Sequence, residues 1–368
     1  MILDSTLREG MQRYGLVLGL EERWEILSGL AAAGISEAEI GVCGRDPSVE
    51  VLADRSRREA LPIRISVWCP LRIPSLEHAA RIRPDIVSLS IPTSDAHVKK
   101  RLHTDAQGLE RMLRDFVAAA FERGLTHLSL GLEDASRTHT ATLQRLAGLA
   151  QDLGIRRIRL ADTVGILDPA ATASLVRKVR KACHLEIGFH GHNDFGMATA
   201  NALSALDAGA DCTDATLLGV GERSGIAATE ELAAFLHFRR RSELDPAVVA
   251  DLARHFLTAA SLRVASWKPI VGESLFHAES GMHVQGLLVD PALYEPFDPS
   301  LIGSSRKLSL GRQVGSAAVR QKLTTLGIVP REGIEPAVAR IRAEAERLGR
   351  PLEDGEIEAV VGRDRTLK

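Results

Sequence analysis

The stretch Glu186-Ile-Gly-Phe-His-Gly-His192, followed by Asn193-Asp-Phe-Gly196 and residues 197–209, decides the fold. Its first part has the pattern of a strand, and Asn193-Asp-Phe-Gly196 has the composition of a turn. Residues 197–209 predict a helix that ends at Gly209. The stretch therefore predicts one strand–helix unit, with His190 and His192 where the strand gives way to a loop.

The same unit recurs along the first two-thirds of the chain. Short apolar runs predict strands at residues 2–5, 37–42, 63–69, 86–91, 127–133, 157–163, 186–192 and 211–217. Amphipathic segments such as residues 21–33, 109–123 and 169–182 lie between them, and many such segments end on glycine: Gly34, Gly124, Gly154, Gly209. Eight such repeats predict an α/β fold of the (β/α)₈ TIM-barrel type. A doubly wound open sheet is the alternative, but no Gly-x-Gly-x-x-Gly motif follows the first strand.

Length and composition agree with a barrel that carries a smaller addition. The chain has 368 residues, of which 45% are hydrophobic and 26% charged, as in globular proteins that are not membrane-embedded. A barrel takes about 250 residues. We therefore expect a barrel over residues 1–240, and a mostly helical C-terminal region over residues 241–368. Within that region, residues 332–348 predict one amphipathic helix.

Charge and cysteine content exclude several classes of protein. The net charge of −2 gives no indication of a nucleic-acid or membrane surface. No apolar run approaches the roughly 20 residues that cross a bilayer, and the start at Met1-Ile-Leu-Asp leaves no room for a signal peptide. The four cysteines are far apart and lie in or beside apolar runs, which is typical of reduced core thiols. We expect a cytoplasmic protein.

His190 and His192 form a candidate metal site. Side chains two residues apart on a strand point to the same face, with Cα atoms roughly 7 Å apart, so two imidazoles can converge on one ion. Two histidines in a polar loop are the alternative. Ionisable and polar residues also end other predicted strands, and barrel active sites lie at the C-terminal strand ends; these are Arg8 and Glu9, Glu133, and Thr163. This clustering favours the metal site.

Two imidazoles and one carboxylate would leave coordination positions open for a substrate. The same ligand types occur in non-haem iron oxygenases. A substrate rich in carboxylate and carbonyl oxygens would suit Mg²⁺, Mn²⁺ or Zn²⁺, which would polarise the carbonyl of a 2-oxo acid. Arg8 could then stabilise the negative charge that develops on its oxygen. Such a site can make or break a carbon–carbon bond next to a carbonyl.

Several motifs resemble those of the DRE-TIM metallolyase superfamily, which contains homocitrate, isopropylmalate and citramalate synthases and hydroxymethylglutaryl-CoA lyase. In the barrel they are Asp4-Ser-Thr-Leu-Arg-Glu-Gly-Met-Gln12, Ala161-Asp-Thr-Val-Gly165, Phe189-His-Gly-His-Asn-Asp194 and Gly219-Val-Gly-Glu-Arg223. Beyond it, the segments at residues 268–286 and 294–299 are similar to the linker subdomains of the synthases. Glu133-Asp-Ala-Ser-Arg137 and Tyr294-Glu-Pro-Phe297 are similar to homocitrate synthases of the nitrogen-fixation type.

The resemblance implies an acyltransferase that joins acetyl-CoA to a 2-oxo acid, with 2-oxoglutarate as the first candidate. It implies Glu9, His190 and His192 as ligands of a divalent metal ion, and Arg8 at the reacting oxygen. Gln12 and Thr163 match residues that hold the carboxylates of the oxo acid, and Glu133 matches a residue that lines the substrate pocket. His283 and Tyr294 match a catalytic pair that the other subunit of a homodimer supplies.

Three positions depart from the synthase pattern. Met11 stands where synthases usually have glutamate and the lyase branch has leucine. Pro70 stands about where the nitrogen-fixation type has arginine, a role that Arg72 could take, and Gly225-Ile226 replaces the Gly-Asn of isopropylmalate synthases. These departures leave open oxaloacetate, pyruvate, 2-oxoisovalerate or phosphonopyruvate as the oxo acid. A carbon–carbon lyase of the hydroxymethylglutaryl-CoA type and a non-catalytic paralogue also remain open.

Overall fold

The structure, a computed structural model, describes residues 1–279 and 281–362. The chain divides into two compact units, of which the first is Met1–Arg263 and the second begins at Val264. Helices α9 (Thr229–Arg240) and α10 (Pro246–Ala259) belong to the first unit, where α10 packs on α1 and α9 contacts β1. The first unit thus continues past residue 240, where the sequence places the end of the barrel.

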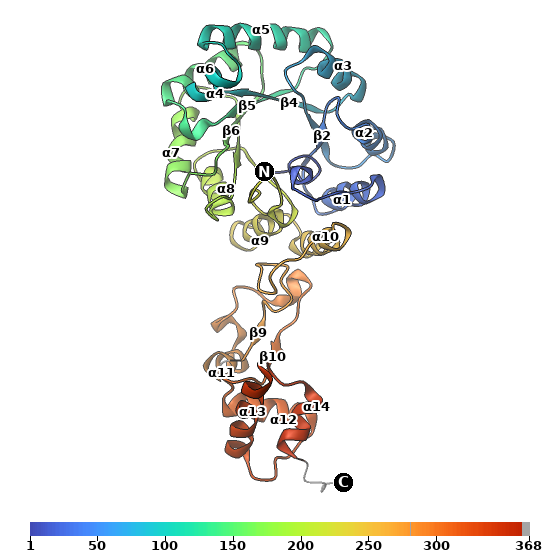
Figure 1. Cartoon of the computed structure of the whole chain (residues 1–368), viewed down its shortest axis with the longest axis vertical. Helices are drawn as coiled ribbons and strands as arrows, with labels where there is room; N and C mark the ends of the chain where they lie inside the picture. Colours follow the sequence, from blue (N-terminus) through green and yellow to red (C-terminus); the bar gives the residue numbers. More distant parts are fainter. Residues whose placement is uncertain (280, 363–368) are drawn as a thin grey trace. The chain divides into compact units, whose positions relative to one another are not determined.

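Eight parallel strands form a closed barrel, as the repeat pattern predicts (Figure 1). The strands follow one another in chain order, and the last pairs with the first through Leu3 and Asp214. They are β1 (Ile2–Asp4), β2 (Glu37–Val42), β3 (Arg64–Trp68), β4 (Ile86–Pro92), β5 (Leu128–Glu133), β6 (Arg157–Asp162), β7 (Glu186–Gly191) and β8 (Cys212–Ala215).

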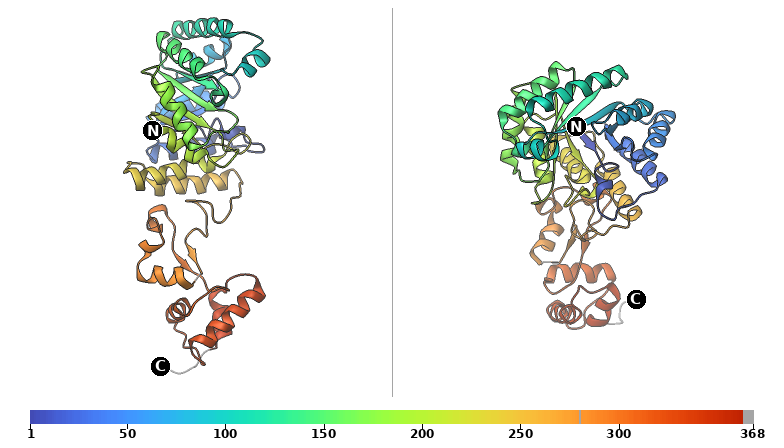
Figure 2. Two further views of the ribbon diagram at one scale, coloured as in Figure 1. Left: turned by 90° about the vertical axis from the view of Figure 1, so that its left-hand side faces the viewer. Right: turned by 45° about the horizontal axis from the view of Figure 1, so that its top comes forward.

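Helices surround the strands on the outside of the barrel, as the views in Figure 2 also show. They are α1 (Leu20–Ala32), α2 (Ser48–Arg58), α3 (Ile73–Ile82), α4 (Asp95–Arg101), α5 (Ala106–Glu122), α6 (Thr140–Asp152), α7 (Pro169–Arg180) and α8 (Ala198–Asp207). Local sequence sets their ends. Asp168 caps α7 by accepting the Ala171 N–H at 2.7 Å, and α6 stops before Gly154, whose φ of +76° favours glycine.

The second unit has its own apolar core, formed by buried side chains between Val284 and Val361. Its elements are β9 (His277–Ala278), α11 (Gly281–Val289), β10 (Lys307–Leu308), α12 (Ser316–Leu326), α13 (Ile334–Leu348) and α14 (Asp354–Val361). Strands β9 and β10 pair in parallel. The helix expected at residues 332–348 is α13, and α14 is an additional helix. Among the described helices, none combines the length and the apolar character that crossing a membrane requires.

Candidate active site at the barrel mouth

Charged side chains in two layers fill the interior of the barrel below its C-terminal mouth. Alternate residues of a strand share a face, so Glu37 and Glu39 on β2, like Arg157 and Arg159 on β6, point the same way. In the lower layer, Arg157 donates two hydrogen bonds of 2.9 Å to Glu37. In the upper layer, Arg159 donates to Glu39 at 3.2 Å and to Asp214 of β8 at 2.9 Å. The barrel therefore has an ionic interior.

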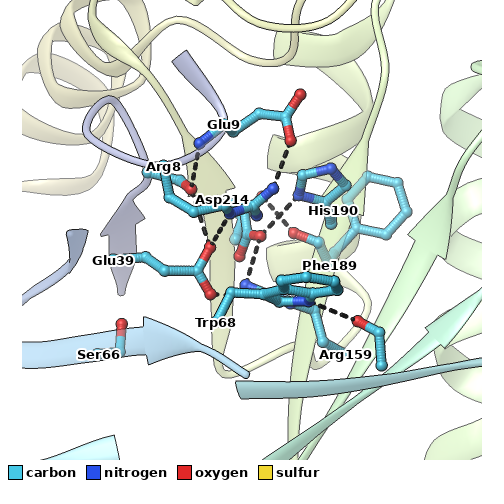
Figure 3. Close-up of polar contacts among 12 residues, drawn as sticks. Arg8, Glu9, Glu39, Ser66, Trp68, Arg159, Phe189, His190 and Asp214 are labelled. Carbon is cyan, nitrogen blue, oxygen red and sulfur yellow. Dashed lines mark hydrogen bonds and ion pairs between the residues drawn. The ribbon is translucent and has the colours of Figure 1, made fainter. Parts of the chain in front are cut away.

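Arg8 and Glu9 lie on the turn that follows β1, above the upper layer. The turn begins where Asp4 accepts the Thr6 N–H at 2.8 Å. Arg8 donates from Nε to Glu39 and from an Nη atom to Glu9, as Figure 3 shows. Only 8% of Arg8 is exposed. The guanidinium is thus fixed from below by one carboxylate and from beside by another.

The two histidines lie together at the end of β7. The Nδ1 atom of His190 is 2.7 Å from an oxygen of Asp214, and the two imidazole centroids are 5.1 Å apart. With the Asp214 carboxylate as acceptor, Nδ1 of His190 carries the proton and Nε2 keeps a free lone pair. His192 Nδ1 is buried and has no hydrogen-bond partner among the described residues. Each ring therefore has a nitrogen suited to a metal ion.

The loop after β8 closes one side of this cluster. The Glu222 N–H donates to Glu9 at 3.1 Å. Arg223 donates to both oxygens of Asp194, at 2.9 and 2.8 Å, and to the carbonyl of Thr163 at 2.8 Å. The loops that follow β6, β7 and β8 are thereby joined around the proposed ligands.

The electrostatic surroundings keep Glu9 ionised and His192 neutral. Burial alone would raise the pKa of Glu9, but its electrostatic interactions with Arg8, His190 and His192 outweigh burial and lower the pKa to about 2. Burial, together with His190, lowers the pKa of His192 to about 4. Burial opposes ionisation of Glu39 too, yet Arg159 and Arg8 hold the pKa of that carboxyl well below its usual range. A carboxylate and neutral imidazoles are the forms that bind divalent metals.

The donor set of Glu9, His190 and His192 fits a divalent ion chemically. Glu9 interacts electrostatically with both rings, and the buried Nδ1 of His192 lacks a partner in the described structure. Within residues 1–279 and 281–362, however, no three His, Cys, Asp or Glu side chains are arranged so that they could hold a metal ion together. Glu9 instead bonds to Arg8 and to the Glu222 N–H.

The other predicted barrel residues differ in their surroundings. Gln12 ends the 3₁₀ helix η1 (Gly10–Gln12), and its side chain is exposed. Thr163 follows β6, and its hydroxyl accepts the N–H of Asp134 at 2.8 Å. Glu133, at the end of β5, forms an ion pair with Arg101 of α4. The carboxylate that the resemblance places in the substrate pocket is therefore bound to Arg101 in this structure.

His283 and Tyr294 lie together in the second unit. Their ring centroids are 4.6 Å apart, and both line a pocket of about 390 Å³ whose other walls include Phe276 and Phe297. Gly286 makes this pairing possible, because a Cβ atom there would lie 2.2 Å from the tyrosine ring. The predicted catalytic pair is therefore pre-assembled within its own unit.

Residues 1–260 match the HMGL-like family, and residues 270–349 match the homocitrate synthase post-HMGL domain. The chain belongs to the HMGL-like family. The two matched segments confirm the predicted resemblance to the homocitrate and isopropylmalate synthase branch, in which a second domain follows the barrel.

Some relatives within this HMGL-like family are synthases that match the chain over nearly its whole length. The chain is 37% identical to homocitrate synthase from Frankia sp. (strain FaC1), over 98% of this chain and 90% of that protein. It is 35% identical to 2-phosphonomethylmalate synthase from Streptomyces rubellomurinus, over 94% and 93%. The structure of HMG-CoA lyase from Bacillus subtilis shares the barrel fold, with a TM-score of 0.64, 20% identity, and coverage of 72% and 94%.

Three residues that contact the site were missing from the sequence prediction: Glu39, Arg159 and Asp214. Each is at most 4% exposed and lies inside a barrel strand. A sequence signal existed, because charged residues are rarely buried without a partner, and strands of a closed parallel barrel are buried on both faces. Charged residues at alternate positions of two such strands thus indicate paired charges in this HMGL-like barrel.

Proposed function

We propose that this protein is an acyltransferase that condenses acetyl-CoA with a 2-oxo acid and requires a divalent metal ion. The observation that carries the proposal is the cluster of Arg8, Glu9, His190 and His192 at the barrel mouth. The full-length similarity to a homocitrate synthase and a 2-phosphonomethylmalate synthase supports it.

Glu9, His190 and His192 would hold the ion, which could be Mg²⁺, Mn²⁺ or Zn²⁺. The ion would supply Lewis acidity to the oxo group of the substrate. An ionised carboxylate has about four acceptor sites, so Glu9 could contribute an oxygen to the ion while it still accepts from Arg8 and the Glu222 N–H.

Arg8 would stabilise the oxygen on which negative charge develops. A guanidinium has five N–H groups; among the described residues, two of those of Arg8 are bonded, to Glu39 and Glu9. The bond to Glu39 fixes its orientation, so the remaining N–H groups need little reorganisation during the reaction. Gln12 and Thr163 would hold carboxylates of the oxo acid, and Glu133 would line the pocket once released from Arg101.

His283 would remove a proton from the methyl group of acetyl-CoA, with Tyr294 beside it. An unperturbed imidazole has a pKa near neutrality, which suits a general base. By resemblance, these two residues act at the barrel of the partner in a homodimer. Their close contact within one unit means that they can be delivered together.

A thiol-release assay tests the function. Metal-free protein would be supplied with Mg²⁺, Mn²⁺ or Zn²⁺, acetyl-CoA and one 2-oxo acid: 2-oxoglutarate, oxaloacetate, pyruvate, 2-oxoisovalerate or phosphonopyruvate. We expect free CoA with at least one acid, with 2-oxoglutarate as the first candidate, and none after chelation. Cleavage of hydroxymethylglutaryl-CoA without any condensation would instead identify the lyase that the apolar Met11 favours.

A further inference from the structure

Arg159 lies beneath both halves of the proposed site. Its two terminal nitrogens bond to different carboxylates: one donates to Asp214 of β8 at 2.9 Å, the other to Glu39 of β2 at 3.2 Å. The three residues come from strands far apart in sequence, and Figure 3 shows them below Arg8 and His190. The planar guanidinium group of Arg159 therefore connects β2 and β8 across the interior of the barrel.

The first arm runs through Glu39 to Arg8. Oxygen Oε1 of Glu39 accepts from Arg159, whereas Oε2 accepts from Nε of Arg8 and from the Ser5 hydroxyl at 3.0 Å. The orientation of the carboxylate is thus set by Arg159 on one side and Arg8 on the other. A rotation of Glu39 would move the guanidinium that we place at the reacting oxygen.

The second arm runs through Asp214 to His190. The same oxygen, Oδ2, accepts from Arg159 at 2.9 Å and faces Nδ1 of His190 at 2.7 Å. The other oxygen, Oδ1, has no hydrogen-bond partner among the described residues. Arg159 is therefore what keeps Oδ2 turned toward His190, and Oδ2 in turn fixes the ring and its tautomer.

Glycine lies beside Arg159 on both neighbouring strands. In the strand register, Gly131 of β5 and Gly188 of β7 flank Arg159 on either side. A Cβ atom at Gly188 would lie 3.4 Å from Cγ of Arg159. Only 4% of Arg159 is exposed, so solvent scarcely reaches it.

We propose that Arg159 is a positioning residue that couples Arg8 to His190 through Glu39 and Asp214, so that the oxyanion-stabilising group and a metal ligand are oriented together. The inference rests on the proposed function. Arginine is needed because its rigid fork presents separate nitrogens to two carboxylates, whereas a lysine ammonium is a single point charge. Replacing a residue that hydrogen-bonds to a metal ligand typically lowers metal affinity or activity by about 10- to 100-fold. Asp214 is such a residue for His190, and Arg159 acts on the ligand through Asp214.

The first experiment compares Arg159→Lys with Arg157→Lys. Arg157 is the matched control, because it is equally buried, also bonds to carboxylates, and belongs to the lower layer. Mn²⁺ binding to metal-free protein is measured by calorimetry, alongside kcat and the KM of the oxo acid. For Arg159→Lys we expect Mn²⁺ affinity and kcat each about 10-fold lower or more, with KM within about twofold. Arg157→Lys should lower thermal stability and leave Mn²⁺ affinity and kcat within about twofold of the wild-type values.

Two outcomes of this comparison would overturn the inference. One is wild-type Mn²⁺ affinity and kcat in Arg159→Lys. The other is a raised KM with unchanged Mn²⁺ binding, which would make Arg159 a substrate contact. If the wild-type protein itself binds no Mn²⁺ or condenses no 2-oxo acid, the proposed function fails instead, so the two failures are distinguishable.

A double-mutant cycle tests the coupling even if Arg159→Lys does not fold. Glu39→Gln should lower kcat with little change in Mn²⁺ affinity, and Asp214→Asn should lower Mn²⁺ affinity. If Arg159 transmits between them, the effect of the double variant on kcat departs from the product of the single effects by a factor of about 3 or more. Independent, multiplicative effects would show that the two arms are not coupled.

Discussion

At the scale of single residues, Arg8 is distinguished from its neighbours because it is the side-chain cation that we place at the reacting oxygen of the substrate. Replacing it with alanine should leave the nitrogen and carboxylate ligands intact but remove one oxyanion-stabilising group. We expect kcat of Arg8→Ala to fall by a factor of about 10² to 10³. Bound metal, measured by elemental analysis, should remain near the wild-type level.

The His192→Ala variant tests metal binding, as Arg8→Ala tests oxyanion stabilisation. This change removes a proposed ligand whose buried Nδ1 has no partner in the described structure. We expect bound divalent metal to fall to background and turnover to be lost with it. Full activity in a metal-free preparation of the wild-type protein would show that the ligand assignment is incorrect.

Asp4 provides a test of pH dependence outside the ligand set. Burial raises the pKa of Asp4 from 3.8 to about 6, against hydrogen bonds from Thr229 and Thr6 that lower it. Because the folded-state pKa is raised, its favourable contribution to stability is complete below pH 3.8 and is lost as pH rises through about 6.

The Asp4→Asn variant removes this titration. Its free energy of unfolding relative to wild type should therefore improve by about 2 kcal/mol between about pH 4.5 and about pH 7.5. Chemical denaturation of both proteins at the two pH values measures the difference. A relative stability that stays constant or moves the opposite way would contradict the raised pKa.

The sequence predicted Arg8, Glu9, His190 and His192 because each stands at the end of a recognisable strand. It did not predict the residues that orient them. Arg159 is separated from Glu39 by 120 residues and from Asp214 by 55. Such pairings depend on which strands face each other across the closed barrel, which local patterns do not reveal.

At the scale of elements, the loop between β8 and α9 sets the position of Glu9 through the Glu222 N–H. Gly225 has φ of +78°, and a Cβ atom there would lie 1.8 Å from the carbonyl oxygen of Gly219. We expect Gly225→Ala to displace the loop, which should lower both metal affinity and the melting temperature. Calorimetry and thermal denaturation would measure the two effects.

Gly148→Ala is the control for this loop variant. Gly148 lies within α6, and nothing is within 4 Å of an added Cβ. Alanine is favoured over glycine in a helix interior by up to about 1 kcal/mol, so this variant should be unchanged or more stable. Equal metal affinity in the two variants would mean that the loop does not support Glu9.

The strands were predicted to within a few residues, since apolar runs bounded by polar turns are local features. For example, residues 157–163 were expected and β6 is Arg157–Asp162. Helix α14 was not expected, although Glu353 and Glu356 form a capping box at its start. Its eight residues are too few for a clear apolar period, and it is stabilised by packing on α13.

At the scale of the whole molecule, the proposed active site needs residues from both units, Arg8 from the first and His283 from the second. By resemblance, His283 acts on the barrel of a partner in a homodimer. Mixing His283→Ala protein with Arg8→Ala protein, under conditions of subunit exchange, should create dimers with one intact site out of two. Those dimers should recover up to about half of wild-type activity.

Light scattering and a tagged subunit would verify that exchange takes place. The matched control is a mixture of His283→Ala with Tyr294→Ala protein, because both changes fall on the same proposed donor segment. Each donor segment in that mixture lacks either His283 or Tyr294, so no complete site forms and no activity should be recovered. If exchange occurs and the mixture of His283→Ala with Arg8→Ala protein recovers no activity, His283 acts in its own subunit or has no catalytic role.

The ionic interior of the barrel also bears on how faithfully the chain folds. If β2 slipped by one residue against its neighbours, Glu37 and Glu39 would turn to the outer face, and Ala38 and Ile40 would turn inward. Arg157 and Arg159 would then lose Glu37 and Glu39 and keep only Glu186 and Asp214, which raises the desolvation cost of their buried charge. A barrel lined only by interchangeable apolar side chains would tolerate such a slip more easily. The buried ion pairs therefore favour the native strand register, because a barrel closed in a shifted register would be less stable.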